Sequence, residues 1–263
     1  MRLKITMMGD ILMYNRTKLI ELIKPWALKM PYICAAWEGG SAATHRLDEF
    51  SDLDLTLVVD EEHVEQAFTD FKNFITQHVH ITRSYRVPEP AWHGVSQCFY
   101  QIDQVTPFLY IDLAVMKRSH RDKLMEQDRH GQAVVWFDHD HVYDPSPSSQ
   151  QVIEERVQKM IQSVTQTDFL IELEIEKGNA RHEFLDVYPT YYSYISRHLA
   201  VMLNVEYRKE RVDFGLRYAR LDYAPCDIKL IQEALQVKDM DGLAKSYGKI
   251  KQRYHELLIK HRT

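Results

Sequence analysis

A proline- and serine-rich stretch, DPSPSSQ at residues 144–150, divides the sequence into two parts with different residue periodicities. Before it, helical patterns alternate with short runs rich in β-branched and aromatic residues, which indicates strands that carry helices. After it, strand signals fade and long helical patterns follow one another. Because these two patterns bury their apolar faces in different ways, we expect two domains, at residues 1–145 and 146–263.

The first part predicts a mixed β-sheet with helices. Residues 14–29 are typical of an amphipathic helix that Pro25 kinks or ends early. A second helix is expected over residues 61–78. Strands are expected at residues 32–37, 53–59, 81–87, 96–102 and 108–116, the last two as an antiparallel hairpin.

The second part predicts an α-helical bundle. Helical patterns cover residues 151–177, 181–209, 227–236 and 240–260. Gly178 is expected to separate the first two, and Asp227 to serve as the N-cap of the third. The expected fold class is therefore α+β, a mixed-sheet domain followed by helices.

Composition narrows the classes of function. The chain has 263 residues, 45% of them hydrophobic, and a formal net charge of -5, which argues against a general nucleic-acid binder. Its three cysteines are too far apart for a CxxC metal site or a disulfide framework. No apolar run near the N-terminus has the length of a signal peptide, and none elsewhere could cross a bilayer. We therefore expect a cytoplasmic protein without membrane partners.

The segment with the clearest chemistry is WEGGSAATHRLDEFSDLDLTLVVD, residues 37–60. A strand is expected to end there at Gly39, Gly40 and Ser41. Adjacent glycines let the backbone approach a ligand closely, and their N–H groups together with a serine hydroxyl can hold phosphate oxygens. The three residues are therefore candidates for binding the phosphates of a nucleotide.

Two carboxylates follow on the next expected strand. Asp52 and Asp54 stand two residues apart, so both project from the same face. Carboxylates side by side repel each other unless a cation lies between them, and Mg²⁺ suits such a site because it prefers oxygen ligands and leaves positions for phosphate oxygens. A phosphate-binding turn beside a carboxylate pair is what transfer of a nucleotidyl group requires.

A third carboxylate, Asp112, lies in the apolar run FLYIDLAVM. A charged residue within a buried strand is costly unless it is paired or bound to a metal. Asp112 is therefore a candidate for a third metal ligand or for the general base that acts on an acceptor hydroxyl.

The order of these motifs resembles the nucleotidyltransferase superfamily that includes DNA polymerase beta. In this chain the order is Gly-Ser, a spacer, Asp-x-Asp and an aspartate on a later strand. The chain length and the helical second part are similar to its antibiotic-modifying branch, the aminoglycoside and lincosamide nucleotidyltransferases. The motif resemblance covers residues 37–116, and THRLDEF stands where the family often has Arg-Gly. The resemblance implies phosphate contacts from Gly40 and Ser41, with Gly39 completing the motif. It also implies metal binding by Asp52 and Asp54 and a third carboxylate at Asp112.

The main hypothesis is thus an Mg²⁺-dependent enzyme that moves a nucleoside monophosphate, AMP from ATP in the first instance, onto a hydroxyl of a small molecule. Pyrophosphate would leave, and the helical domain would bind the acceptor, which could be an aminoglycoside- or lincosamide-like antibiotic. One alternative is a toxin–antitoxin type of nucleotidyltransferase that modifies a protein or tRNA. Another is a nucleotide-binding regulator without catalysis.

Other polar groups have less specific interpretations. His139 and His141 could bind zinc but are more typical of an exposed turn. The basic cluster at residues 117–121 could assist a triphosphate but is more typical of a solvated helix start. In the second part, an acidic group and a tyrosine group could line an acceptor pocket, although core tyrosines with exposed glutamates are the simpler interpretation. These groups are Glu172, Glu174, Glu176 and Glu183, and Tyr188, Tyr191, Tyr192 and Tyr194.

Overall fold

A computed structural model describes residues 14–91, 94–120 and 125–261. The chain divides into two compact units, the second beginning at Ser148. The first contains a mixed sheet with helices and the second is helical, so the predicted α+β class is confirmed. Residues 1–13, on which part of the signal-peptide expectation rests, and Arg121 of the basic cluster lie outside the described residues. None of the described helices is both long enough and apolar enough to cross a membrane.

The described strands form one six-stranded sheet in the order β3-β4-β5-β2-β1-β6. Only β2 and β5 are parallel neighbours, and the other pairs are antiparallel. The hairpin predicted from residues 96–116 is therefore present as β4 and β5. The edge strand β6 was not predicted from the sequence. The strands are β1 (Ile33–Glu38), β2 (Leu53–Val59), β3 (Ile81–Arg86), β4 (Ser96–Ile102), β5 (Tyr110–Lys117) and β6 (Val134–Asp138).

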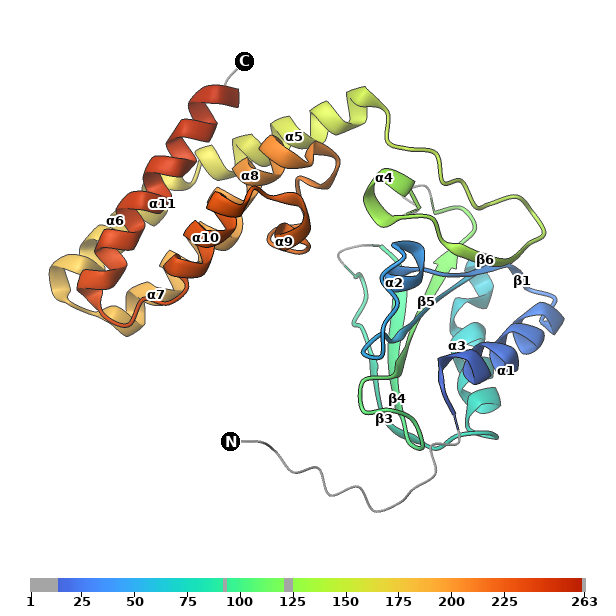
Figure 1. Ribbon diagram of the computed structural model, residues 1–263. Coiled ribbons are helices and arrows are strands. Elements are labelled where there is room, and N and C mark those ends of the chain that lie inside the picture. The colour runs from blue at the N-terminus through green and yellow to red at the C-terminus, as the bar shows by residue number, and fades with distance from the viewer. Residues whose placement is uncertain (1–13, 92–93, 121–124, 262–263) are drawn as a thin grey trace. The chain divides into compact units, whose positions relative to one another are not determined.

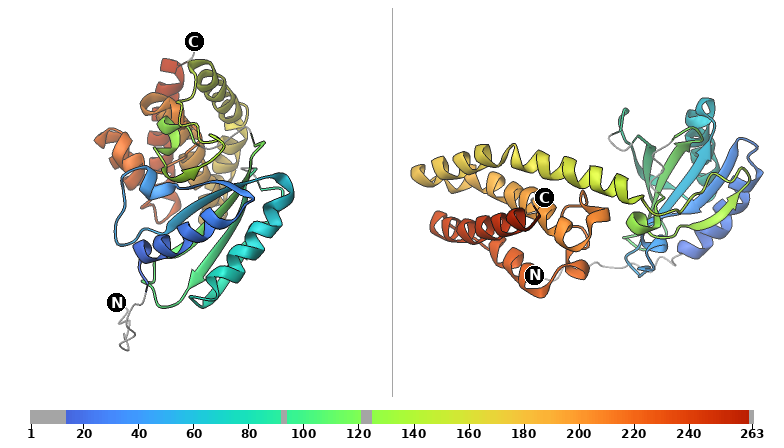
Figure 2. Two further views of the ribbon diagram at one scale, coloured as in Figure 1. Left: turned by 90° about the vertical axis from the view of Figure 1, so that its right-hand side faces the viewer. Right: turned by 90° about the horizontal axis from the view of Figure 1, so that it is seen from above.

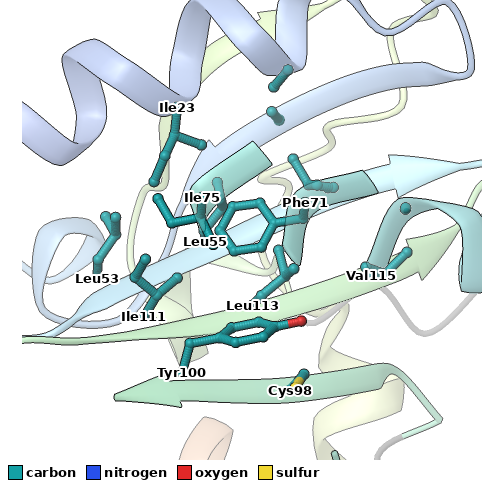
Figure 3. Packing of buried hydrophobic residues seen from close by; sticks show 14 of the residues in the cluster. Ile23, Leu53, Leu55, Phe71, Ile75, Cys98, Tyr100, Ile111, Leu113 and Val115 are labelled. Carbon is teal, nitrogen blue, oxygen red and sulfur yellow. The ribbon is translucent and has the colours of Figure 1, made fainter. Parts of the chain in front are cut away.

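Two helices, α1 (Arg16–Lys29) and α3 (Val64–Ile75), lie on one face of this sheet (Figures 1 and 2). Their buried side chains pack on the odd-numbered residues of β2 and β5, as Figure 3 shows for Ile23 and Phe71 beside Leu55 and Leu113. Shorter helical segments are η1 (Glu61–His63), α2 (Gly40–Ala43) and α4 (Gln127–His130).

The expectation that Pro25 could end the first helix early is wrong. Helix α1 continues through Pro25 to Lys29. Proline removes one backbone hydrogen bond from the helix, but the flanking residues Ile23, Trp26 and Ala27 are buried in the core. The apolar surface that these side chains bury on both sides of Pro25 offsets the free-energy cost of the lost hydrogen bond.

The second unit has its own apolar core, centred on α8 and α11. Its helical segments are α5 (Gln150–Thr165), α6 (Asp168–Arg181), α7 (Phe184–Ser193), the π-helix η2 (Tyr194–Leu199), α8 (Ala200–Tyr207), η3 (Lys209–Arg211), α9 (Ala219–Asp222), α10 (Pro225–Ala234) and α11 (Met240–His261).

Two sequence-based boundaries in this unit are wrong. Gly178 does not separate helices but lies within α6, where a Cβ atom would come 1.6 Å from Cγ2 of Val187, so glycine is needed for close packing against α7. The N-cap of α10 is Ala224, with Pro225 at the first helical turn. Asp227 is instead buried and accepts hydrogen bonds from Tyr207 and Arg253.

Candidate active site

Asp54 and Asp112 lie side by side on the face of the sheet opposite α1 and α3. They are register partners on the parallel strands β2 and β5. Their neighbours Leu53 and Ile111 are fully buried in the core on the helix-covered face. Because successive side chains of a strand point to opposite faces, the apolar residues fix the direction of both carboxylates.

Asp52 stands directly before β2 and completes a group of three carboxylates. Its charge acts on both neighbours, because it contributes to the raised pKa of Asp54 and, after burial, to the raised pKa of the Tyr110 hydroxyl. Burial and the charges of Asp52 and Asp112 raise the pKa of Asp54 from 3.8 to about 7, against a hydrogen bond from the Ser41 backbone that lowers it. The group therefore concentrates negative charge, which a bound cation would relieve.

Asp112 is oriented by a side chain that the sequence interpretation did not single out. Nε2 of Gln97, on the neighbouring strand β4, donates to both carboxylate oxygens of Asp112, at 2.7 and 2.9 Å. Burial raises the pKa of Asp112 to about 6, although the Gln97 bonds lower it, and the charge of Asp52 raises it further. A carboxylate with this pKa is mostly ionised at neutral pH and remains able to accept a proton.

The turn after β1 brings Gly39, Gly40 and Ser41 against the carboxylates. The backbone N–H of Gly39 donates to the Asp54 carbonyl oxygen at 3.0 Å. Gly40 has a positive φ of 52°, and a Cβ atom there would lie 1.8 Å from Oδ2 of Asp54. Only glycine fits this position, because both the backbone conformation and the space exclude a side chain.

Ser41 presents a hydroxyl that no described residue of the protein uses. Its Oγ atom is buried and has no hydrogen-bond partner among the described residues. Buried hydroxyls are normally hydrogen-bonded, so an unused one beside Asp54 is consistent with a ligand that supplies the missing acceptor.

Glu38 and Arg16 support the site and were missed in the sequence. Glu38, the last residue of β1, is only 4% exposed and forms an ion pair with Arg16. The indole N–H of Trp136 donates to the second Glu38 oxygen at 2.7 Å, and Nε of Arg16 donates to the Asp52 carbonyl oxygen at 3.3 Å. A glutamate directly before the two glycines was the available signal, but its partners come from distant segments.

The donor set fits a hard divalent cation. The described residues include no group of three or more histidine, cysteine or acidic side chains already arranged around one metal position. Asp52 and Asp54 nevertheless offer oxygen ligands only, and they are close enough for the charge of Asp52 to raise the pKa of Asp54. Such a pair suits Mg²⁺, which keeps several positions for water and phosphate oxygens.

Other polar groups singled out in the sequence make contacts elsewhere in the structure. Arg118 of the basic cluster is ion-paired with Asp60 and Asp140 at the far end of β2 and β5 from the aspartates. Tyr191 and Tyr194 are fully buried core residues, and Glu172 is ion-paired with Lys251 and His255.

Comparison with known proteins gives one family match. A family model described as streptomycin adenylyltransferase matches residues 13–218. Among solved structures, an aminoglycoside 6-adenyltransferase from Bacillus subtilis is similar, with 11% sequence identity over 93% of this chain and 89% of that chain and a TM-score of 0.35. A search among curated proteins finds no match.

Proposed function

The chain belongs to the streptomycin adenylyltransferase family, and on that premise we propose that it transfers AMP from ATP to a hydroxyl group of an aminoglycoside antibiotic. The family makes the protein an adenylyltransferase with ATP as its donor. The observation that carries the proposal for the site is the pairing of Asp54 with Asp112 beside the turn at Gly39–Ser41. Residues 1–145 form the catalytic domain in this proposal, and residues 146–263 form a helical domain for the acceptor.

The phosphates of ATP are held on the β1 side of the site. Gly40 leaves space for close approach, and the Ser41 hydroxyl supplies a donor that has no partner within the described protein. Asp52 and Asp54 would bind Mg²⁺, which when present neutralises charge on the phosphate oxygens. The raised pKa of Asp54 supports this assignment, because burial and, after it, the charges of Asp52 and Asp112 disfavour the ionised carboxylate, which a bound cation would favour.

Asp112 acts as the general base in this proposal. It accepts the proton of the acceptor hydroxyl while the acceptor oxygen bonds to the α-phosphorus of ATP. The bond from the α-phosphorus to the bridging oxygen breaks, and pyrophosphate leaves. Gln97 holds both oxygens of Asp112 and so fixes the direction from which the proton is taken. Asp112 is assigned as the base because burial raises its pKa to about 6, which suits a group that accepts a proton near neutral pH, and each oxygen keeps a lone pair beside its bond from Gln97.

Labelled transfer tests the proposal directly. The protein is incubated with ATP labelled on the α-phosphate, Mg²⁺, and separately with streptomycin, other aminoglycosides, a lincosamide, a protein mixture and tRNA. We expect label on an aminoglycoside. Asp54→Asn should abolish it and Asp112→Asn should slow it by about 100-fold or more, the usual contribution of a general base.

Glu62→Gln removes the same charge at an exposed position outside the site and serves as the matched control. It should leave transfer unchanged. Label on protein or tRNA in place of an aminoglycoside would reject the acceptor class. Full activity of Asp54→Asn would reject the metal assignment.

A further inference from the structure

A row of register partners crosses four strands on the face that carries the aspartates. Asp54 on β2 pairs with Asp112 on β5, Asp112 with Phe99 on β4, and Phe99 with Tyr85 on β3. The rings of Tyr85 and Phe99 stack with centroids 6.4 Å apart and planes 13° apart. Because neighbouring strands are about 4.8 Å apart, this aromatic surface begins one strand from the carboxylate of Asp112.

The two rings line a pocket of about 300 Å³, together with Arg83, Ser84, Gln101 and Tyr110. Tyr110 stands two residues before Asp112 on β5, so both side chains project from the same face and the pocket adjoins the carboxylate group. Tyr85 is 59% exposed. Its ring would lose much of that exposure if a ligand lay on it.

The in-line geometry of the transfer reaction places the acceptor on the opposite side of the α-phosphorus from the leaving pyrophosphate. In phosphoryl-type transfer, the attacking and leaving oxygens lie roughly in line on opposite sides of phosphorus. The leaving pyrophosphate belongs at Gly40 and Ser41, beyond β2 on the β1 side. The attacking hydroxyl must then approach from the other side of Asp54, across Asp112, which is the side of β4 and β3.

The geometry points to this pocket as the subsite for the reacting ring of the acceptor. The inference rests on the proposed function and narrows it, because it places that ring on the first unit and not on the helical domain. It takes a hydroxylated saturated ring, a sugar or cyclitol, whose apolar face lies on Tyr85 and Phe99. Gln101 supplies polar groups for ring hydroxyls, and the hydroxyl nearest Asp112 is the one that attacks. The cationic side chain of Arg83 disfavours an ammonium group in the pocket, so the charged groups of an aminoglycoside lie outside it.

Steady-state kinetics with separate ATP and acceptor titrations test this assignment. The variants are Phe99→Ala and Tyr85→Ala, and Leu28→Ala is the control, because Leu28 is similarly exposed, at 51%, on a helix that covers the opposite face. We expect KM for streptomycin to rise about tenfold in each pocket variant, the equivalent of about 1.4 kcal/mol of lost binding. KM for ATP and the thermal stabilisation by Mg-ATP should stay within about twofold of the parent.

Calorimetric binding of an aminoglycoside panel without ATP gives an independent readout. Weaker binding by both pocket variants, with the control unchanged, supports the subsite even if the parent transfers no AMP. In that case only the proposed reaction fails. A rise in KM for ATP would assign the pocket to the adenine ring and overturn the inference. Unchanged acceptor binding in both variants, or no panel member bound by the parent, would overturn it too.

Discussion

Gly40 is the residue at which backbone conformation and chemistry are most tightly connected. Alanine there would require an unfavourable positive φ and would place Cβ on the Asp54 carboxylate. Gly40→Ala should therefore displace Asp54 or the turn and lower kcat for AMP transfer by about 100-fold or more. The measurement is transfer of labelled AMP beside a thermal melt that reports whether the variant folds.

Gly39→Ala is the matched control for this prediction. Gly39 has a φ of −100°, and a Cβ atom there would meet only Cβ of Asp54 at an ordinary 3.9 Å. This variant should retain much more activity than Gly40→Ala. Equal loss in the two variants would show that close approach at Gly40 is not the decisive feature.

The raised pKa of Asp54 predicts that the free energy of unfolding depends on pH and on Mg²⁺. Its pKa is raised from 3.8 to about 7, so the folded state favours the protonated form. The stability that it contributes is complete below about pH 4 and is lost as the pH rises through about 7. Without metal, Asp54→Asn should therefore match the parent near pH 4 and exceed its free energy of unfolding at pH 8, by about 1 to 3 kcal/mol.

Urea denaturation at several pH values, with and without Mg²⁺, measures this difference. Mg²⁺ should stabilise the parent more at pH 8 than at pH 5, because the ligands must be ionised to bind it. It should have little effect on the variant. A stability difference between parent and variant that is the same at every pH would contradict a raised pKa at Asp54.

Individual residues differ in how far the sequence predicts them. Asp54 and Asp112 stand out because a carboxylate within an apolar strand is costly, and their pairing across β2 and β5 agrees with that signal. Gln97 carries no such signal, since a glutamine is ordinary in any strand. Its importance comes from pairing between strands, which residue patterns within one strand do not reveal. The catalytic roles themselves remain predictions.

At the scale of elements, the Arg16–Glu38 ion pair joins the start of α1 to the end of β1. Glu38 is buried and Arg16 is partly buried, with 5% and 22% of their side chains exposed. Removing one partner leaves a poorly solvated charge, so Arg16→Met or Glu38→Gln should each lower stability by about 2 to 4 kcal/mol. Because Arg16 also bonds to the Asp52 carbonyl oxygen, transfer should slow as well.

A double-mutant cycle measures the pair itself. The combined variant should be less destabilised than the sum of the two single variants, since neither charge is then left alone. Strict additivity in chemical denaturation would mean that the two side chains act independently.

Element boundaries were predictable where the residue pattern is strict. Strand β2 follows alternation between Leu53 and Leu57, and its bounds match the prediction. Strand β6 was missed because it is an edge strand whose Val134 and Val135 are both exposed, so no alternation marks it. The prediction that Gly178 separates two helices was wrong because it relied on the low helix propensity of glycine. Here the close packing of α6 against Val187 requires glycine inside the helix.

At the scale of the whole molecule, each unit has a separate apolar core. The proline- and serine-rich stretch gave a sequence signal for such a division, because it interrupts both the strand and the helix patterns. The sequence could not indicate which unit contains a pocket for the acceptor. A pocket depends on residues from three strands and a loop, as the one beside Phe99 does.

Two cores predict two unfolding transitions in calorimetry of the full chain. Leu113 and Leu203 are both fully buried, one in each core. Leu113→Ala should lower the temperature of one transition and Leu203→Ala that of the other, because each variant reduces the free energy of unfolding of its own unit by about 2 to 5 kcal/mol.

Mg-ATP at about 100 times its Kd should raise the free energy of unfolding of the first unit alone, by about 2.7 kcal/mol, because the proposed nucleotide contacts all come from that unit. It should therefore shift only the transition that Leu113→Ala lowers. Asp54→Asn should remove that shift. If Mg-ATP instead raised the transition that Leu203→Ala lowers, the helical unit would have to contribute directly to nucleotide binding, and the assignment of the nucleotide site to the first unit alone would fail.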